Sequence, residues 1–180
     1  IISRSEVDLA AKLSPTQELD IPIITSPMDT VTESAMAISM SKLGGLGIVH
    51  RYNTISTQVG IIRKIRAEVE EGNHIAAAIG VTGDFEERAQ ELHNAGVDIL
   101  CIDVAHGHHV AMQGALSKLR KRFGGDKHLM AGNIATHYGF RDLAHWGASS
   151  IRVGIGGGSI CSTRLKTGHG VPTWQSVRDC

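Results

Sequence analysis

The chain of 180 residues has few aromatic side chains, only 4% of the total, and no excess of charge of either sign. Its 18 basic and 18 acidic residues are interspersed, so the sequence indicates neither a nucleic-acid-binding surface nor a basic patch that would bind a membrane. No apolar run approaches the length of a membrane span, and no signal-peptide pattern is present. These features favour a globular protein, and a chain of this length normally forms one domain with a substantial core.

Cysteine is scarce as well. Cys101, Cys161 and Cys180 are odd in number and widely spaced along the chain. This pattern argues against a disulfide framework and against a four-cysteine metal site. It indicates a reducing compartment, which we expect to be the cytoplasm.

Glycine, in contrast, is abundant, with 21 residues, and four of them together with Ser159 precede Cys161 in the segment 154–164. Glycine lets the backbone approach a ligand without a Cβ in the way. The amides and carbonyls that such a loop exposes can hold a phosphate or a cation. The loop therefore indicates that Cys161 is a thiol nucleophile beside an anchored phosphorylated substrate.

Two other interpretations of this loop stay open at this point. A single cysteine is more often a small buried apolar residue than a nucleophile. The glycines also resemble a dinucleotide-binding fingerprint, but Ser159 replaces the third glycine and no acidic residue follows before Asp179. The choice between these interpretations depends on what the rest of the chain supplies.

Short apolar, β-prone runs alternate along the chain with segments of helical character. The expected strands are residues 21–25, 46–49, 76–79, 99–102, 129–131 and 151–153. The expected helices are residues 34–43, 58–71, 84–94, 112–123 and 137–145. Strands and helices that alternate in this way are typical of βα units around a parallel sheet.

Polar residues cluster directly after the expected strands, where the carboxyl ends of parallel strands meet. Because five of the six strands carry such residues, a closed ring is favoured over an open sheet, which would use one crevice. An eight-fold barrel needs about 200–250 residues, and only six units are countable here. The sequence therefore predicts an incomplete barrel.

Several motifs now become recognisable together. They are Ser26-Pro27-Met28-Asp29-Thr30-Val31-Thr32-Glu33, Gly44-Gly45-Leu46-Gly47-Ile48-Val49-His50, Ala95-Gly96-Val97-Asp98, Asp103-Val104-Ala105-His106-Gly107-His108, Ala131-Gly132-Asn133-Ile134-Ala135-Thr136 and the loop 154–164. In this order they resemble the IMP dehydrogenase / GMP reductase family. The resemblance implies a TIM (β/α)8 barrel, of which residues 1–180 would supply about six βα units as an incomplete catalytic domain. The regulatory CBS modules that dehydrogenases usually insert have no room, because residues 58–79 run straight through.

The resemblance also implies a chemistry. In the dehydrogenase, the loop cysteine, here Cys161, attacks carbon 2 of IMP, a hydride passes to NAD, and hydrolysis of the covalent adduct releases XMP. A thiolate suits this role because its nucleophilicity is set by its pKa. Thr163 matches a hydroxyl used near the reacting carbon.

Further site residues follow from the resemblance alone. Asp103 matches a residue near the nicotinamide ribose, and Asn133, Arg152 and Gly154 match the floor of the purine and nicotinamide site. Ser26 and Met28 match residues that flank the substrate base and sugar, and Ser159 matches a residue that contacts its phosphate. The carbonyls of Gly156, Gly158 and Cys161 match those that hold a potassium ion.

Some of these residues have simpler interpretations. Asp103 could cap the next helix, Asn133 could close a turn, and His50 could be a satisfied core histidine. The spacing of His106, His108 and His109 is that of a metal site, but we interpret them as residues of the barrel rim because no fourth ligand with a matching pattern stands nearby.

The resemblance does not separate the two activities of the family. The Ser-Ile-Cys, Ala-His-Gly-His and Ser-Pro-Met-Asp-Thr-Val-Thr-Glu segments favour IMP dehydrogenase, with NAD and IMP as partners. Lys166-Thr167-Gly168 is more typical of GMP reductase, which would use GMP and NADPH.

The strands that complete the barrel in the family, with its substrate phosphate site and mobile flap, are not in the sequence. We therefore expect a completing segment or second chain, and homotetramers of whole barrels. A non-catalytic fragment or a subunit of a split barrel is the alternative from a different class.

Overall fold

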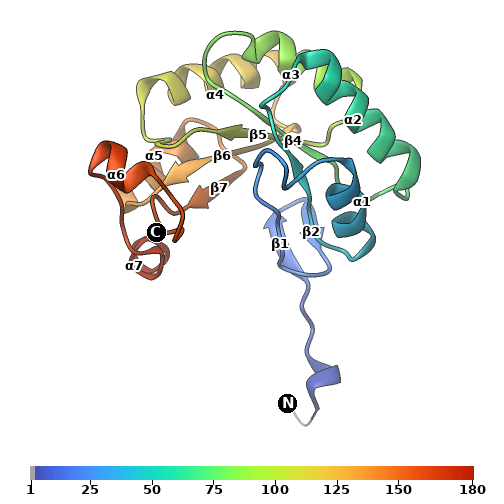
Figure 1. Ribbon diagram of the computed structural model, residues 1–180, viewed down its shortest axis with the longest axis horizontal. Coiled ribbons are helices and arrows are strands. Elements are labelled where there is room, and N and C mark those ends of the chain that lie inside the picture. Colours follow the sequence, from blue (N-terminus) through green and yellow to red (C-terminus); the bar gives the residue numbers. More distant parts are fainter. Residues whose placement is uncertain (1–2) are drawn as a thin grey trace.

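The computed structural model describes residues 3–180 and shows an arc of parallel strands with helices along its outer side (Figure 1). The strand order is β3-β4-β5-β6-β7, which is the order along the chain. These strands are β3 (Ile48–Val49), β4 (Ala76–Ile79), β5 (Ile99–Asp103), β6 (His128–Ile134) and β7 (Ser150–Val153). The helices that connect or precede them are α1 (Ser34–Lys42), α2 (Ile55–Glu68), α3 (Phe85–Asn94), α4 (Val110–Phe123) and α5 (His137–His145). The expected alternation of strands and helices is confirmed.

The prediction of a regular first strand at residues 21–25 is wrong. This segment makes only one parallel bridge, between Ile24 and Leu46 beside β3. Pro22 has no N–H to donate, and the N–H of Ile23 donates to the carbonyl of Ile21 at 2.8 Å instead of to a neighbouring strand. The segment thus occupies the sixth position of the arc without forming a regular strand.

Several elements lie outside the expected pattern. An antiparallel hairpin of β1 (Ala11–Ser14) and β2 (Gln17–Leu19) lies near the N-terminus, after the short 3-10 helix Arg4–Glu6. Two short helices, α6 (Thr163–Thr167) and α7 (Thr173–Asp179), follow β7. The expected helix 58–71 begins earlier, at Ile55, because the Thr54 side chain accepts from the N–H of Thr57 and caps it.

The core has two parts, one on each face of the sheet. Alternate residues of the strands pack under the helices, as Leu100 and Ile102 do on β5. The intervening residues, such as Ile99 and Cys101, form a second cluster on the inner face, which Leu19 of the hairpin joins. A curved parallel sheet with helices outside and side chains filling the inside is the architecture of a TIM barrel.

The described residues therefore form part of such a barrel, as expected. Its two edges are the segment around Ile24 and strand β7. Among residues 3–180, no helix is long and apolar enough to cross a membrane.

Candidate functional site

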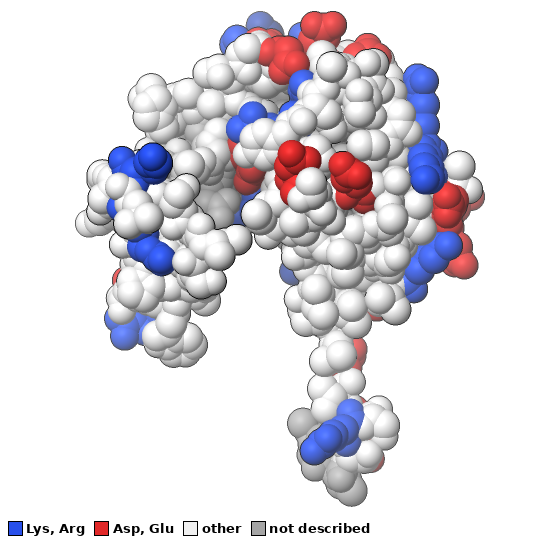
Figure 2. Space-filling model, viewed as in Figure 1, with Lys and Arg blue, Asp and Glu red and all other residues white. Residues whose placement is uncertain are grey.

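The carboxyl ends of β5, β6 and β7, the segments that follow β5 and β7, residues 26–28 and Tyr52 surround one cavity of about 620 Å³. Figure 2 shows the molecule hollowed between the C-terminal segment with α6 and α7 and the body beside it, with basic and acidic residues interspersed over the face in view. All but one of the residues expected in the site line this cavity. They are Ser26, Met28, Asp103, Asn133, Arg152, Gly154, Gly156, Gly158, Cys161 and Thr163.

Ser159 is the exception, because it is exposed on the loop and does not line the cavity. The structure adds Tyr52 and Ile160, which we did not expect in the site. Tyr52 follows the rim residue His50 by two positions, and this position in the sequence could have identified it as a residue of the site. Ile160 is 89% exposed, so its apolar side chain offers contact area to a ligand or to another chain segment.

Cys161 is half-buried on the loop directly before α6. Hydrogen bonds from Thr163 lower the pKa of its thiol and outweigh burial, which raises it. The charge of Arg164 makes a smaller contribution that also lowers the pKa. The interpretation of Cys161 as a buried apolar residue is therefore wrong. Cys101 is the buried one: it is fully enclosed on the inner face, and burial raises its pKa to about 12.

Asp103 and Arg152 form an ion pair between the end of β5 and β7, through Oδ1 and Nη1. The same Nη1 lies 3.8 Å from the sulfur of Cys101. Burial lowers the pKa of Arg152, but Cys101 and Asp103 outweigh it, and the net shift is upward. Asp103 does not cap the next helix, because His109 does so by accepting from the N–H of Ala111.

Asn133 follows a cis peptide bond at the register irregularity of β6. Its side-chain Nδ2 donates to the carbonyl of Gly154 at 2.9 Å, and its own carbonyl accepts from the N–H of Gly107 at 2.6 Å. Asn133 therefore joins the rim loops that follow β5 and β7. It lines the cavity and does not only close a turn.

The glycine loop does not present an open cation cradle. The carbonyl of Gly156 already accepts from Nη1 of Arg164, and that of Gly158 accepts from the N–H of Cys161 at 3.2 Å. The Arg164 stem is packed against Gly170, where a Cβ would lie 2.7 Å from its Cγ. Two of the three expected potassium ligands, the carbonyls of Gly156 and Gly158, are thus engaged in hydrogen bonds within the protein in this arrangement.

The end of the cavity at Asp103 offers a group that could hold a nucleotide. Asp103 offers a carboxylate whose second oxygen has no protein partner within residues 3–180, and such an oxygen can accept from a ribose hydroxyl. Tyr52 lines the same cavity with 60% of its surface exposed.

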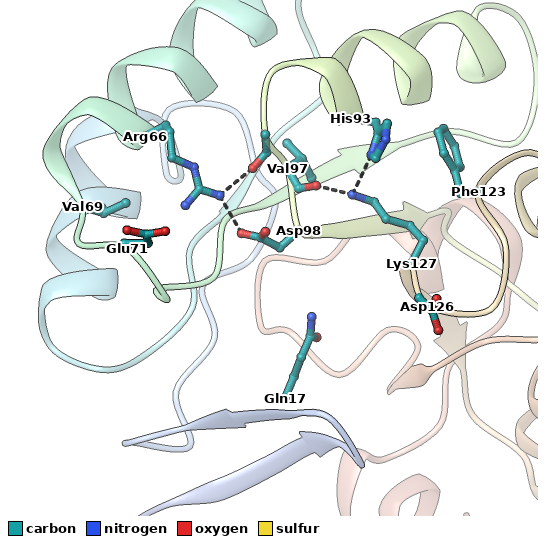
Figure 3. Close-up of a pocket in the computed structure, with 11 residues that line it drawn as sticks. Gln17, Arg66, Val69, Glu71, His93, Val97, Asp98, Phe123, Asp126 and Lys127 are labelled. Atoms are coloured by element: carbon teal, nitrogen blue, oxygen red, sulfur yellow. Dashed lines mark hydrogen bonds and ion pairs between the residues drawn. The ribbon is translucent and has the colours of Figure 1, made fainter.

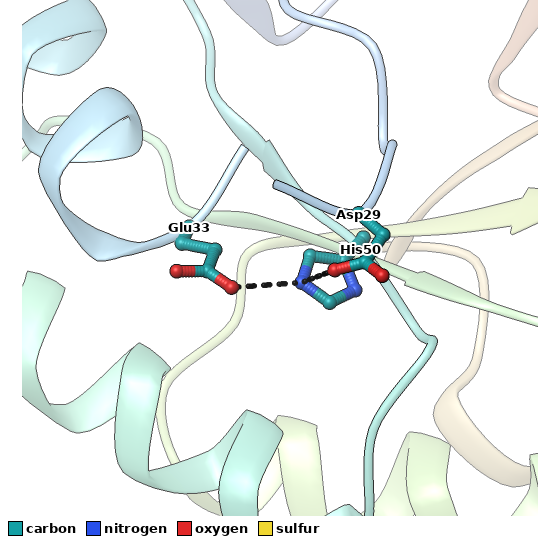
Figure 4. Close-up of side chains that lie close together, drawn as sticks. All are labelled: Asp29, Glu33 and His50. Carbon is teal, nitrogen blue, oxygen red and sulfur yellow. Dashed lines mark hydrogen bonds and ion pairs between the residues drawn. The ribbon is translucent and has the colours of Figure 1, made fainter. Parts of the chain in front are cut away.

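His50 lies behind the rim between two carboxylates (Figure 4). It is only 2% exposed, and its Nε2 lies 3.4 Å from Oε1 of Glu33 and 3.8 Å from Oδ1 of Asp29. Its Nδ1 accepts from the N–H of Tyr52 at 3.2 Å, so a neutral ring carries its proton on Nε2, toward the carboxylates. A metal at Nε2 would need that nitrogen's lone pair, and we therefore interpret His50 as a satisfied core histidine.

The three histidines after β5 have separate partners. His108 Nε2 lies 2.9 Å from Oδ2 of Asp142, and His106 Nδ1 accepts from the N–H of His108 at 3.3 Å. His109 caps α4. Each ring thus has its own role in the rim loop.

A second cavity, of about 830 Å³, lies at the amino ends of β5 and β6 (Figure 3). The two basic side chains Arg66 and Lys127 that line it are engaged with the protein itself. Arg66 donates to Gly96 and Asp98 at 2.6 and 2.8 Å, and Lys127 donates to the carbonyl of Val97. These contacts hold the loops before the strands, which in a parallel barrel is the end associated with stability.

Comparisons with known proteins agree with this geometry. The family model of the IMP dehydrogenase / GMP reductase domain matches residues 1–180. Inosine-5'-monophosphate dehydrogenase of Cryptosporidium parvum is 34% identical over 97% of this chain and 53% of its own length. The enzymes of the same name from Borreliella burgdorferi and Nitrosopumilus maritimus are 33% and 29% identical over 97% and 100% of this chain.

The chain spans about half to two thirds of the length of these relatives. The family match nevertheless covers every residue, and the barrel arc carries the motif residues at its carboxyl rim. The chain belongs to the IMP dehydrogenase / GMP reductase family.

Proposed function

We propose that this chain provides the catalytic part of an enzyme that oxidises IMP to XMP with NAD. The observation that carries the proposal is the half-buried thiol of Cys161, whose pKa is lowered and which faces the same cavity as Asp103, Arg152 and Asn133. Perturbed nucleophiles in a cleft mark functional sites. The names of the relatives support the direction of the reaction.

In the proposed mechanism, the Cys161 thiolate forms a bond to carbon 2 of the purine. When bound, NAD would accept the hydride that carbon 2 loses together with its electron pair. Water then adds to carbon 2, the carbon–sulfur bond breaks, and XMP, the free thiolate and a proton result. Thr163 stabilises the thiolate by its hydrogen bonds, which is the role its contacts support.

Binding of the partners is assigned to the rim. We propose that Ser26 and Met28 flank the substrate base and sugar, and that Ser159 binds the phosphate. Asp103, Asn133, Arg152 and Gly154 would form the cofactor end. The exposed position of Ser159 requires the loop to fold over the phosphate.

We also propose that the barrel is completed by a further segment or chain, and that whole barrels assemble as homotetramers. The one-sided pairing of β7 and of the Ile24 segment supports completion. The alignment with the Nitrosopumilus relative extends over 301 positions, so that relative carries segments that these 180 residues lack. This agrees with a catalytic domain without CBS modules.

GMP reductase is the second candidate, favoured by Lys166-Thr167-Gly168 in the exposed stretch after the catalytic loop. The complete assembly is therefore assayed with IMP and NAD, and separately with GMP and NADPH. NADH formation from IMP is expected. Ammonia release from GMP without NADH formation would identify a reductase instead.

The Cys161→Ala variant tests the mechanism in the same assembly, with Cys180→Ala as the matched control. Cys161→Ala is expected to lose turnover while it still binds IMP, and Cys180→Ala should remain active. Near-normal turnover by Cys161→Ala would refute covalent catalysis. Absence of both nucleotide binding and turnover in the wild-type assembly would favour a non-catalytic fragment.

Potassium remains a prediction of the resemblance. Because Arg164 occupies the carbonyl of Gly156, a potassium ion could bind there only after that guanidinium leaves. Turnover in potassium chloride is compared with turnover in lithium chloride at equal ionic strength. A higher rate in potassium would support the site, and equal rates would count against it.

A further inference from the structure

Asp103, Gly132 and Arg152 occupy one register row across β5, β6 and β7. Residues of one row in a parallel sheet point to the same face, and neighbouring strands lie about 4.8 Å apart. The backbones at Asp103 and Arg152 are therefore separated by two strand spacings, roughly 10 Å, with Gly132 between them. The ion pair between the two side chains must cross β6 at this position.

Gly132 leaves the space for that crossing. A Cβ at Gly132 would lie 2.7 Å from the Cβ of Arg152 and 2.9 Å from its carbonyl oxygen. Both atoms are fixed by the backbone of β7, so neither can swing aside as the end of a long side chain could. Gly132 has no positive φ, so the position needs glycine for its lack of a side chain and not for a special backbone conformation.

The crossing places the Arg152 guanidinium against two groups of β5. It binds Oδ1 of Asp103 and lies 3.8 Å from the sulfur of Cys101. Cys101 is fully buried, so it supports the guanidinium from the core side, while the pair itself remains 24% and 18% exposed at the cavity. With Oδ1 held, the second oxygen of Asp103 is left for a ligand.

We propose that Gly132 is a positioning residue for the cofactor end of the site. Because it carries no side chain, it lets Arg152 cross β6 and fix the Asp103 carboxylate in the orientation that receives the ribose of a nicotinamide nucleotide. This inference rests on the proposed function and adds a residue that itself touches neither substrate nor cofactor.

The test compares Gly132→Ala with Gly114→Ala in the active assembly. Gly114 lies in α4, where an added Cβ meets no atom within 4 Å, so it controls for the substitution itself. We expect Gly132→Ala to raise the KM for NAD by about tenfold or more, with less than about a twofold change in the protection of Cys161 by IMP. Gly114→Ala should match the wild type. An unchanged KM for NAD in a folded Gly132→Ala enzyme would overturn the inference.

A double variant separates positioning from general damage to the fold. If Gly132 acts through the ion pair, adding Gly132→Ala to Asp103→Asn should not weaken NAD binding further. The KM for NAD of this double variant should equal that of Asp103→Asn alone to within about twofold. Effects that multiply instead would show that Gly132 acts on the fold only, and would overturn the inference.

Should Gly132→Ala fail to fold, the pair itself is tested with Arg152→Gln, Asp103→Asn and their double variant. We expect the KM for NAD of the double variant to differ by about fivefold or more from the value that the two single effects would give if they multiplied. Single effects that do multiply would overturn the inference. A wild-type assembly that oxidises no IMP would refute the proposed function instead. The melting temperatures of the same three variants are then measured by thermal unfolding. Additive effects of the two substitutions on the melting temperature would also contradict an ion pair between Arg152 and Asp103 across β6.

Discussion

Two cysteines of this chain lie in environments that shift the pKa of their thiols in opposite directions. Cys161 is on a loop, where hydrogen bonds from Thr163 stabilise its thiolate, whereas Cys101 is enclosed in the barrel interior, where burial favours the neutral thiol. A nucleophile must be both ionised and accessible. Labelling of the folded protein should therefore modify Cys161 before Cys101.

Thr163→Val tests the origin of this ionisation. Loss of the hydroxyl removes the largest contribution that lowers the pKa of Cys161, so the midpoint of alkylation rate against pH should move upward. At pH 7 we expect alkylation to slow by about threefold to tenfold, since one pKa unit is a factor of ten in thiolate. Thr163→Ser keeps the hydroxyl and should retain the wild-type profile. A pH profile that is the same in all three proteins would contradict this account.

Strand β6 carries both Gly132 and Asn133 near its carboxyl end. At its start, His128 is buried and its Nε2 lies 2.7 Å from Oγ of Ser150 on β7. Burial, with smaller contributions from the charges of Arg120 and His74, lowers the pKa of His128 to about 4. The folded protein therefore holds a neutral imidazole at this point of the sheet.

This lowered pKa predicts a loss of stability in acid. Between the ordinary value of histidine, near 6.5, and about 4, the unfolded chain binds a proton that the folded chain does not. The contribution of His128 to the free energy of unfolding should therefore be completely present above about pH 6.5. The free energy of unfolding should fall by roughly 3 kcal/mol as the pH drops to about 4. Urea unfolding across this range measures it. His128→Gln should reduce the slope, with exposed His145→Gln as the control, and an equal slope in both variants would contradict the assignment.

At this scale the sequence predicted most of the architecture. Buried parallel strands are continuously apolar, and β4, β5 and the first half of β6 were recognisable for this reason. The segment 21–25 is equally apolar, but Pro22 and the local bond of Ile23 reduce it to one bridge. The hairpin β1–β2 was missed because its residues are mostly polar and it contributes chiefly Leu13 and Leu19 to the inner cluster.

The site was predictable as a set but not in its internal contacts. The motifs indicated which residues reach the rim, since rim position follows from where each strand ends. They did not indicate that Arg164 would bind the carbonyl of Gly156, or that Arg152 would reach Asp103 across β6. Such contacts depend on side-chain length and on the register of strands that are distant in the sequence.

At the scale of the whole molecule, the unpaired edges of the sheet predict how the chain behaves without further barrel strands. Among the described residues, β7 pairs only with β6, and the Ile24 segment makes a single bridge, to Leu46 just before β3. Unpaired edges favour aggregation. We expect the 180 residues expressed alone to aggregate or melt early, and co-expression with a polypeptide that supplies the missing barrel strands to restore a cooperative transition. Size-exclusion chromatography and calorimetry measure both. A monodisperse, active monomer of 19.2 kDa would contradict this architecture.

The shared row of Asp103, Gly132 and Arg152 has a consequence for how such chains change in evolution. The distance between the backbones at Asp103 and Arg152 is set by the number of strands between them, so added residues in a connecting loop such as 124–126 leave it unchanged. One residue gained or lost inside β6 would instead turn the following side chains to the opposite face of the sheet. Relatives should therefore differ in length between their helices and strands, while the strands from β5 to β7 keep their residue count.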